Sequence, residues 1–339
     1  MRAGLGPPPA GLPQLNVSRL LDLAACGRHF EILYLDGMEL DLPAAPPLET
    51  GTVWHGLHEL WTDNGWVGEE AHTQRLAAEA TENMDDEVGS AWINRAWPEY
   101  IKKFPVEPPG GKPIGAETPV WFEHDGYYIV GKIDKPCVKA LPDGSLGLWE
   151  GQVKTTTPRK DLGVFCDEYR RSWHCIAYGL ALHHATEKDY QREFGIPKPT
   201  YMGVWLDVAI KHPYPTVPVN TTKDGRITPA YQVKLDAYKE KLLNWSSSLF
   251  YDQEIPFDAL DPRIDHVLHQ FSRLMRLMER GILIENPSMC DNWWRRTCPY
   301  KGRACEERYY DDRYRKRESD YVTLSPDRSE KTTRAGGEE

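Results

Sequence analysis

The chain lacks any apolar run long enough to cross a membrane, although 40% of its 339 residues are hydrophobic. A membrane-spanning helix needs about 20 consecutive apolar residues, so no such helix is expected. The proline- and glycine-rich residues 1–15 also lack the continuous apolar segment of a secretory signal. We therefore expect a disordered leader at the N-terminus and a protein of the cytoplasm.

Positive charge is scarce, because 41 Lys and Arg residues face 51 Asp and Glu residues and leave a net charge of −10. This balance argues against a protein that coats nucleic acid nonspecifically. It does not exclude a nuclease, since metal-binding carboxylates are themselves acidic and a local basic groove can exist on an acidic surface. The adjacent Arg170 and Arg171 are candidates for lining such a groove, with ordinary solvated surface charge as the alternative.

Cysteine is also rare, and the seven cysteines are an odd number in a chain that is large for a disulfide scaffold. Clustered cysteines in a cytosolic protein point more often to metal or catalysis than to disulfides. Cys290, Cys298 and Cys305 lie close together in the sequence, and Cys26 is the distant residue that would complete a tetrahedral set. Four thiolates fit an iron–sulfur cluster or structural zinc. The paired short spacings of a zinc ribbon are missing, which favours iron, and unrelated thiols are the remaining alternative.

Hydrophobic periodicity divides the chain into helical and extended segments without internal repeats. A period near 3.6 predicts helices and a period of 2 predicts strands. Helices are expected over residues 17–35, 50–61, 66–105, 167–185, 231–250 and 265–280, and strands over 117–123, 127–138, 146–155 and 201–210, the first three antiparallel. This order predicts one α/β domain over residues 16–308 with a small central sheet, followed by a disordered charged tail over 309–339.

The segment 131–157 is predicted to be a β-hairpin with an unusual set of polar residues. Its first strand ends in Asp134. Its second strand carries Glu150, Gln152 and Lys154 at alternating positions, so these three side chains share one face. A turn is expected at 142–144. A carboxylate on one strand that faces a carboxylate-x-lysine run on its neighbour is a compact way to hold a divalent metal beside a phosphate.

Metal-assisted phosphodiester hydrolysis needs oxygen ligands for Mg²⁺ or Mn²⁺, a polarised water and a cation near the scissile phosphate. Asp134 is the first ligand candidate, and Gln152 and the backbone carbonyl of Val153 follow on the neighbouring strand. Lys154 would position or help to deprotonate the water and offset charge on the phosphate. Taken alone the pattern is weak, because charged residues near a strand end are usually ordinary surface.

Helical residues on either side of the hairpin add to the metal-site hypothesis. His55 lies on a helix before the strands, where its imidazole can add a nitrogen ligand, which suits Mn²⁺ better than Mg²⁺. His174 and Tyr178 stand four residues apart, share one helix face and can contact DNA or the metal site. Packing of these side chains into the core is the alternative for both helices.

The order C…GxxxH…E…GxxD…(D/E)xK…QxxxY…C…C…C resembles the iron–sulfur branch of the RecB-like nucleases in the PD-(D/E)xK superfamily. That branch includes the AddB nuclease domain, the CRISPR-adaptation exonucleases and many phage-encoded relatives. The resemblance implies a restriction-endonuclease-like α/β fold with a central mixed sheet, a helical N-terminal region and a C-terminal segment tied by a [4Fe-4S] cluster. It also implies a Mg²⁺- or Mn²⁺-dependent deoxyribonuclease, in particular an exonuclease acting on single-stranded DNA or DNA ends.

The partners implied by the resemblance are DNA and recombination, helicase or CRISPR-adaptation proteins, in a bacterial or phage-infected cytoplasm. Carried over residue by residue, the resemblance gives each candidate a role. The matches are His55 and Asp134 as metal ligands, Glu117 as a supporting acidic residue, Lys154 as the catalytic lysine, Tyr178 as the DNA-contacting tyrosine, and Cys26, Cys290, Cys298 and Cys305 as cluster ligands.

Two residues depart from the family pattern. Gln152 stands where the family has Asp or Glu, and His174 stands where it usually has Gln. A glutamine carbonyl can ligate a hard cation but brings no negative charge, so metal affinity should fall unless Glu150 reaches in. The alternatives are a natural inactive member or a deliberately disabled variant. A non-catalytic iron–sulfur DNA-binding or assembly module is therefore the second hypothesis, and a structural zinc protein without a nucleic-acid role is the third.

Overall fold

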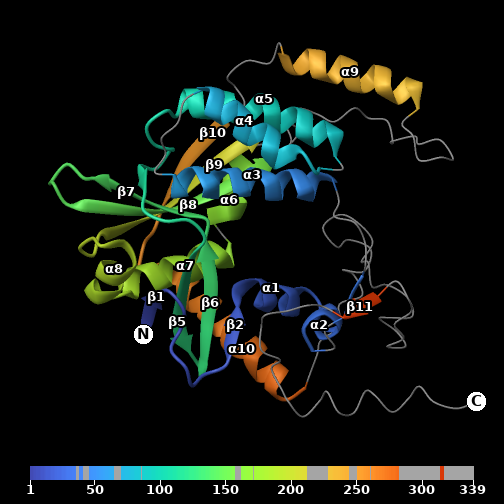
Figure 1. The fold of residues 1–339 in the computed structure, drawn as a ribbon. Helices are drawn as coiled ribbons and strands as arrows, with labels where there is room; N and C mark the ends of the chain where they lie inside the picture. Colours follow the sequence, from blue (N-terminus) through green and yellow to red (C-terminus); the bar gives the residue numbers. More distant parts are fainter. Residues whose placement is uncertain are drawn as a thin grey trace, which may run out of the picture.

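The computed structural model of the chain describes residues 1–35, 38–40, 46–64, 70–84, 86–156, 162–170, 172–211, 228–243, 250–259, 261–281 and 314–316. Its helices are arranged around two principal sheets, both mixed (Figure 1). None of the described helices is both long enough and apolar enough to cross a membrane.

The first sheet contains N-terminal strands that the sequence did not predict. Its strands, in the order β1–β5–β6–β2, are β1 (Ala3–Leu5), β5 (Thr118–His124), β6 (Tyr127–Ile133) and β2 (Gln14–Asn16). Strand β1 is antiparallel to β5, and β2 is parallel to β6. The expectation of a disordered leader is therefore wrong. Leu5 and Leu15 are completely buried, so the few apolar side chains among the prolines and glycines are sufficient to dock this segment.

Helices that pack around this four-stranded sheet include α1 (Val17–Ala25), α7 (Trp173–His184) and α10 (Pro262–Glu279). Asn16 caps α1, since its side chain accepts a 2.7 Å hydrogen bond from the backbone N–H of Arg19. A short helix α2 (Gly27–Phe30) and a π-helical turn (Glu31–Leu35) follow α1, which confirms that the segment 17–35 is largely helical. The predicted helix 265–280 is confirmed by α10.

The second sheet is five-stranded and contains the predicted hairpin. In the order β10–β9–β8–β7–β4, its strands are β10 (Phe250–Pro256), β9 (Thr200–Ile210), β8 (Leu146–Thr156), β7 (Lys135–Ala140) and β4 (Lys112–Pro113). Strand β8 is parallel to β9, whereas the other neighbours are antiparallel. The turn between β7 and β8 is where it was expected, and Asp143 accepts a 2.9 Å hydrogen bond from the Ser145 N–H within it.

Asp134 marks the place where the chain passes from one sheet to the other. The prediction of one continuous strand over 127–138 is wrong, because β6 ends at Ile133 and β7 begins at Lys135. Ile133 pairs with Thr118 in the four-stranded sheet, whereas Lys135 pairs with Gly151 in the five-stranded sheet. The pairing partner thus changes at Asp134, and the expected single central sheet is replaced by two sheets that meet at this residue.

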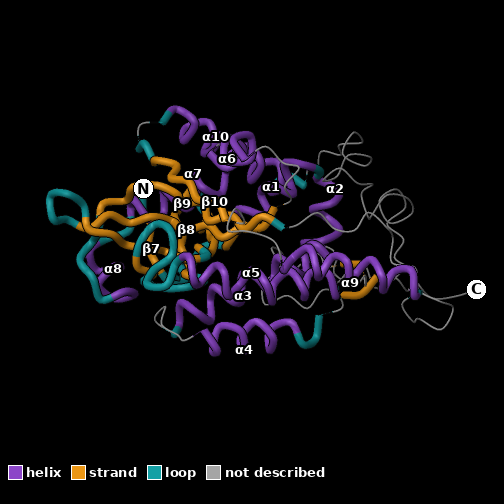
Figure 2. Tube along the Cα trace, turned by 90° about the horizontal axis from the view of Figure 1, so that it is seen from above, coloured by secondary structure: helices purple, strands orange, loops and turns teal. Residues whose placement is uncertain are grey.

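Helices cover both faces of the five-stranded sheet (Figures 1 and 2). On one face lie α3 (Pro46–Asp63), α4 (Glu70–Thr81), α5 (Glu87–Lys103) and α9 (Pro229–Leu243); on the other lie α6 (Leu162–Arg170) and α7. The first face has an aromatic core in which Trp54 and Trp97 pack with Val153 of β8. Because side chains alternate along a strand, Gln152 and Lys154 point to the opposite face, toward α6 and α7.

Several boundaries differ from the prediction for local reasons. The expected helix 167–185 is two helices, because Ser172 caps a new helix by accepting a hydrogen bond from the His174 N–H at 3.2 Å. The expected helix 231–250 ends earlier, at Leu243, and its last residue instead begins β10, an edge strand of alternating burial. A further helix, α8 (Glu187–Phe194), follows α7.

Two short segments from opposite ends of the sequence also pair. Strand β3 (Met38–Leu40) is antiparallel to β11 (Tyr314–Lys316). The prediction of a disordered tail over 309–339 is wrong for the residues of β11, whose backbone hydrogen bonds go to a partner distant in sequence. The rest of that predicted tail lies outside the described residues.

Candidate active site

The carboxylate of Asp134 is held from the neighbouring strand. Its Oδ2 atom accepts hydrogen bonds from the backbone N–H of Val153 and from Nζ of Lys154, both at 3.1 Å. Asp134 follows β6 directly, and the two donors are consecutive residues of β8. The junction between the sheets therefore presents this carboxylate in one fixed orientation.

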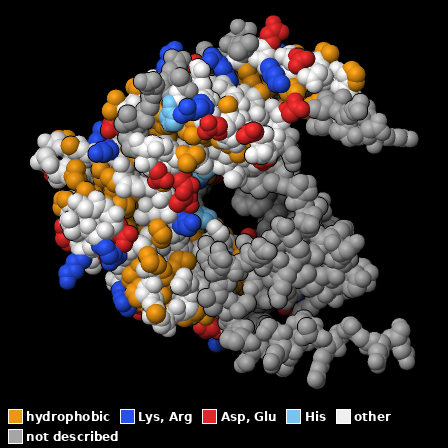
Figure 3. All heavy atoms as spheres, in the orientation of Figure 1, with side chains coloured by type: hydrophobic (Ala, Val, Ile, Leu, Met, Phe, Trp, Pro, Cys, Tyr) orange, Lys and Arg blue, Asp and Glu red, His pale blue; other side chains and the backbone are white. Residues whose placement is uncertain are grey.

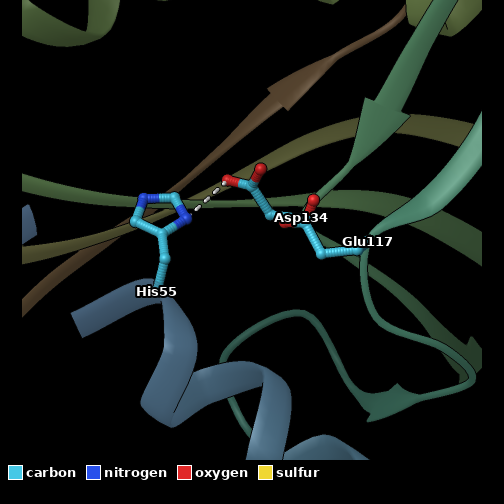
Figure 4. A group of neighbouring side chains, drawn as sticks. All are labelled: His55, Glu117 and Asp134. Atoms are coloured by element: carbon cyan, nitrogen blue, oxygen red, sulfur yellow. Dashed lines mark ion pairs between the residues drawn. The ribbon is translucent and has the colours of Figure 1, made fainter. Parts of the chain in front are cut away.

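His55 approaches the same carboxylate oxygen from helix α3. Its Nδ1 atom lies 3.6 Å from Oδ2 of Asp134, and the imidazole points toward the carboxylate (Figure 4). Helix α3 packs through Trp54 and Leu57 into the core that also contains Val153. These two side chains bury α3 against β8. His55, which lies between them in the sequence, is thereby placed at the edge of the sheet.

Glu117 completes this group from the residue before β5. Its φ of +46° lies in the left-handed region, which residues other than glycine rarely adopt. Its backbone N–H donates a 3.1 Å hydrogen bond to the carbonyl oxygen of Asp134. His55, Glu117 and Asp134 each offer one ligand atom, and these three atoms lie within 4.8 Å of one another. An unfavourable backbone conformation therefore accompanies the convergence of three metal-ligating side chains.

The electrostatics of the group fit a divalent cation. Burial lowers the pKa of His55, so its imidazole is neutral near pH 7 and keeps a lone pair for a metal. Partial burial and the neighbouring charge of Asp134 raise the pKa of Glu117. A cation between the two carboxylates would relieve this repulsion. Two carboxylates and one imidazole are a suitable donor set for Mn²⁺ or Mg²⁺.

Glu150 and Gln152 form a buried pair on the face of β8 that points toward α7. Nε2 of Gln152 donates a 2.7 Å hydrogen bond to Oε1 of Glu150, and the Tyr201 hydroxyl lies 3.4 Å from the other carboxyl oxygen. Glu150 is completely buried, and this burial raises its pKa to about 8. The carboxyl group of Glu150 therefore forms its hydrogen bonds with Gln152 and Tyr201. Val153 contacts Asp134 through its backbone N–H, not through the carbonyl oxygen that was expected to bind a metal.

Helix α7 places His174 and Tyr178 beside the hairpin. Nε2 of His174 lies 3.2 Å from the Ser18 hydroxyl, and burial, with the nearby charge of Lys154, lowers the pKa of His174 to about 4. The ring of Tyr178 lies directly on Gly131, where an added Cβ atom would be only 2.0 Å from the tyrosine Cε1 atom. The glycine three residues before Asp134 is thus required by close approach of the tyrosine ring.

Other candidates lie elsewhere or outside the described residues. Arg170 forms a 3.0 Å ion pair with Asp167 on its own helix, and its carbonyl accepts a hydrogen bond from Arg263. These contacts place Arg170 at the junction of α6 and α10 rather than with His55 and Asp134. Cys26 is buried between α1 and α2. Arg171, Cys290, Cys298 and Cys305 lie outside the described residues.

Two charged residues that were not predicted from the sequence lie next to the candidates, Lys132 and Lys135. Lys132 is exposed, and its Nζ atom lies 3.9 Å from a Glu117 carboxyl oxygen. Lys135 directly follows Asp134 but is buried on the opposite face of the sheet. Strand alternation applied to the GxxD segment would have found Lys132. In the space-filling view, acidic, basic and histidine side chains gather on one part of the surface (Figure 3). This part lies between the helical layer that contains α3 and the four-stranded sheet.

The buried Glu150 carboxyl group predicts a pH-dependent stability of the metal-free protein. Its pKa rises from its ordinary 4.5 to about 8 on folding, so between these values the folded protein keeps a proton that the unfolded chain releases. The contribution of Glu150 to the free energy of unfolding should therefore fall as pH rises through this range, by up to about 1.4 kcal/mol per pH unit. Buried histidines with a lowered pKa, such as His174, contribute with the opposite sign. Urea unfolding in EDTA from pH 5 to 8 should therefore give a more negative slope in the wild type than in Glu150→Gln, by up to the amount that Glu150 contributes.

Glu79→Gln is the matched control, because Glu79 is an exposed residue of α4; it should keep the wild-type slope. An equal slope in the wild type and in Glu150→Gln would contradict the prediction.

Comparison with known families supports the interpretation of this geometry. Residues 14–306 match the model of the PD-(D/E)XK nuclease superfamily. A search of curated proteins finds no match to the chain. The matched span includes the His55, Glu117 and Asp134 group as well as Lys154, and nucleases of this superfamily use divalent metal ions. Since the family model covers most of the sequence, the chain belongs to the PD-(D/E)XK nuclease superfamily.

Proposed function

We propose that the protein is a Mg²⁺- or Mn²⁺-dependent deoxyribonuclease whose metal ligands are His55, Glu117 and Asp134. The observation that carries the proposal is the convergence of these three side chains within 4.8 Å, with Lys154 bound to the same Asp134 oxygen as His55. The order of the sequence motifs supports action on single-stranded DNA or DNA ends in recombination, repair or phage and mobile-element DNA processing.

The protein's own residues supply orientation and charge for hydrolysis. A bound divalent ion would lower the pKa of its water and polarise a phosphoryl oxygen. The Val153 N–H and Lys154 hold the Asp134 carboxylate in place for the ion. Lys154 is 23% exposed, so its ammonium group can also donate to the attacking water or the scissile phosphate and offset negative charge there. His174 and Tyr178 are proposed to contact the DNA strand beside the metal.

Replacement of Lys154 tests this role directly. Lys154→Ala should lower kcat/KM for a labelled single strand with Mn²⁺ by a factor on the order of 10²–10³, because the cation beside Asp134 is lost. Lys139→Ala removes the same charge from an exposed position of the same hairpin and should leave cleavage unchanged. Equal degradation by the wild type and Lys154→Ala would mean that the activity belongs to a contaminant.

A second candidate function is a DNA-binding or assembly module that does not cut. The observation that favours it is the Glu150–Gln152 pair. Gln152 is uncharged and donates to Glu150, and the pKa of Glu150 near 8 leaves that carboxyl largely protonated at pH 7. The strand therefore supplies less negative charge to the metal than an acidic residue at position 152 would.

Exchanging the two side chains separates these functions. Gln152→Glu alone places two carboxyl groups within hydrogen-bonding distance, and they would share a proton. Glu150→Gln/Gln152→Glu keeps the hydrogen bond and puts the carboxylate at position 152. The double variant should bind Mn²⁺ about tenfold or more tightly than the wild type, and cleave faster than either single variant. Calorimetric Mn²⁺ titration and the strand-cleavage assay provide the measurements.

An inactive wild type together with an active exchanged variant would favour the binding module. Unchanged Mn²⁺ affinity in the exchanged variant would show that position 152 does not contact the metal.

We also propose a [4Fe-4S] cluster held by Cys26, Cys290, Cys298 and Cys305, with structural zinc as the alternative. The proposal is supported by the cysteine spacing and by the pairing of β3 with β11, two segments that follow Cys26 and Cys305 closely in sequence. Protein purified without oxygen should be brown, and Cys298→Ala should lose the broad visible absorbance. Cys137→Ala, at a buried thiol on β7, should keep the colour, whereas colourless zinc-containing protein would refute the cluster.

A further inference from the structure

Behind the proposed metal ligands lies a buried polar cluster formed by Lys135, Asp207, Tyr100 and His58, here called the Lys135 cluster. Nζ of Lys135 lies 2.9 Å from Oδ2 of Asp207, and the Tyr100 hydroxyl donates to the same oxygen. The same Nζ lies 3.4 Å from Nδ1 of His58. Lys135 is 1% exposed and Asp207 2%, so this ion pair is shielded from water.

Members of the Lys135 cluster adjoin the residues proposed to bind the metal. Lys135 directly follows Asp134 in the chain. His58 comes three residues after His55 on α3, so the two lie on neighbouring turns of one helix face. Asp207 on β9 is the register partner of Val153, whose N–H holds the Asp134 carboxylate. Contacts within the cluster therefore connect α3 and α5 with β7 and β9, and β9 in turn pairs with β8.

Aromatic rings surround the helix side of the cluster. The His58 ring lies 4.8 Å from that of Tyr100 and 5.2 Å from that of Trp97, both in edge-on contact. Tyr100 and Trp97 belong to α5, which packs against α3 in the same aromatic core. The imidazole is thus enclosed by side chains that allow it little lateral movement, and Lys135 approaches it from the sheet.

A buried ion pair is a poor source of net stability, because the cost of removing both charges from water largely cancels their attraction. Its hydrogen bonds are directional, however, and can be satisfied only at one spacing of the elements that carry them. An apolar contact between α3 and the sheet would tolerate a small slide of the helix. The Lys135 cluster does not, since a slide would separate Lys135 from His58 in an environment without water.

We propose that the Lys135 cluster positions the metal-binding residues by fixing α3 against the five-stranded sheet, so that His55 meets the Asp134 carboxylate. The inference rests on the proposed function of His55, Glu117 and Asp134 as a metal site. Lys135, Asp207 and Tyr100 are positioning residues, because they act through His58, the chain at Asp134 and the β8–β9 pairing.

The test is the Mn²⁺ affinity of the full-length protein without DNA, measured from the electron paramagnetic resonance signal of free Mn²⁺. Thermal unfolding of each variant is followed by circular dichroism, and affinity is measured at a temperature where the variant is folded. Lys135→Met should weaken Mn²⁺ binding about tenfold or more, the size of effect seen when groups that orient metal ligands are removed. Tyr100→Phe, which removes one oxygen atom, should weaken it by a smaller factor.

Two further variants separate positioning from stability. Phe271→Leu loosens the core beneath α10, away from the cluster, and should lower the melting temperature with unchanged Mn²⁺ affinity. Lys135→Met/Asp207→Leu/Tyr100→Phe removes the ion pair and the hydroxyl together. It should recover much of the stability lost in Lys135→Met, because no unpaired buried charge remains, yet its Mn²⁺ affinity should stay low.

Wild-type Mn²⁺ affinity in Lys135→Met and in the triple variant would overturn the inference and leave the metal site intact. If Lys135→Met does not fold, the triple variant and Tyr100→Phe are used instead, and wild-type Mn²⁺ affinity in both of them would overturn the inference. Absence of Mn²⁺ binding by the wild type, or wild-type affinity in His55→Ala, would overturn the proposed metal site itself. The two failures are therefore distinguishable.

Discussion

The structure of the site depends on one carboxylate, that of Asp134, where the chain leaves one sheet and enters the other. Its Oδ2 atom accepts from a backbone N–H and an ammonium group of β8, and the His55 imidazole approaches the same oxygen. Its carbonyl oxygen also holds the N–H of Glu117. The carboxylate and the backbone carbonyl of Asp134 therefore both hold the junction together. Movement of either sheet would separate the metal-ligating side chains.

Charge around this carboxylate is divided between the two faces of the five-stranded sheet. On the α7 face, Glu150 and Gln152 form a pair whose carboxyl group has its pKa raised by burial to about 8. On the α3 face, Lys135 and Asp207 neutralise each other out of reach of solvent. The proposed metal site lies at the edge between these faces. Glu117 and Asp134 are its partly exposed acids, and Lys132 and Lys154 are the cations paired with them.

Local patterns allowed the hairpin, the helix with His55 and the strand over 201–210 to be predicted, because their periodicity and turn residues depend on neighbours in sequence. The pairing of residues 3–5 with β5 could not be predicted in this way, since three residues carry no detectable period. Strand β10 was not predicted either, because polar residues over 252–254 fill the middle of this edge strand. Residues such as Lys135 and Asp207 look like surface charges in sequence, and only their burial reveals that they are partners.

By itself, the sequence determined which side chains are available at the hairpin and on which face of β8 they lie, because strand alternation is a local property. It also determined that position 152 carries an uncharged amide. Only the tertiary structure decided that the predicted strand breaks at Asp134, that Glu117 and His55 reach the same carboxylate, and that Glu150 is enclosed beside Gln152. The physical reason is that convergence and burial arise from packing between segments that are far apart in sequence, 107 residues for Tyr100 and Asp207. No local window of sequence contains both partners of such a contact.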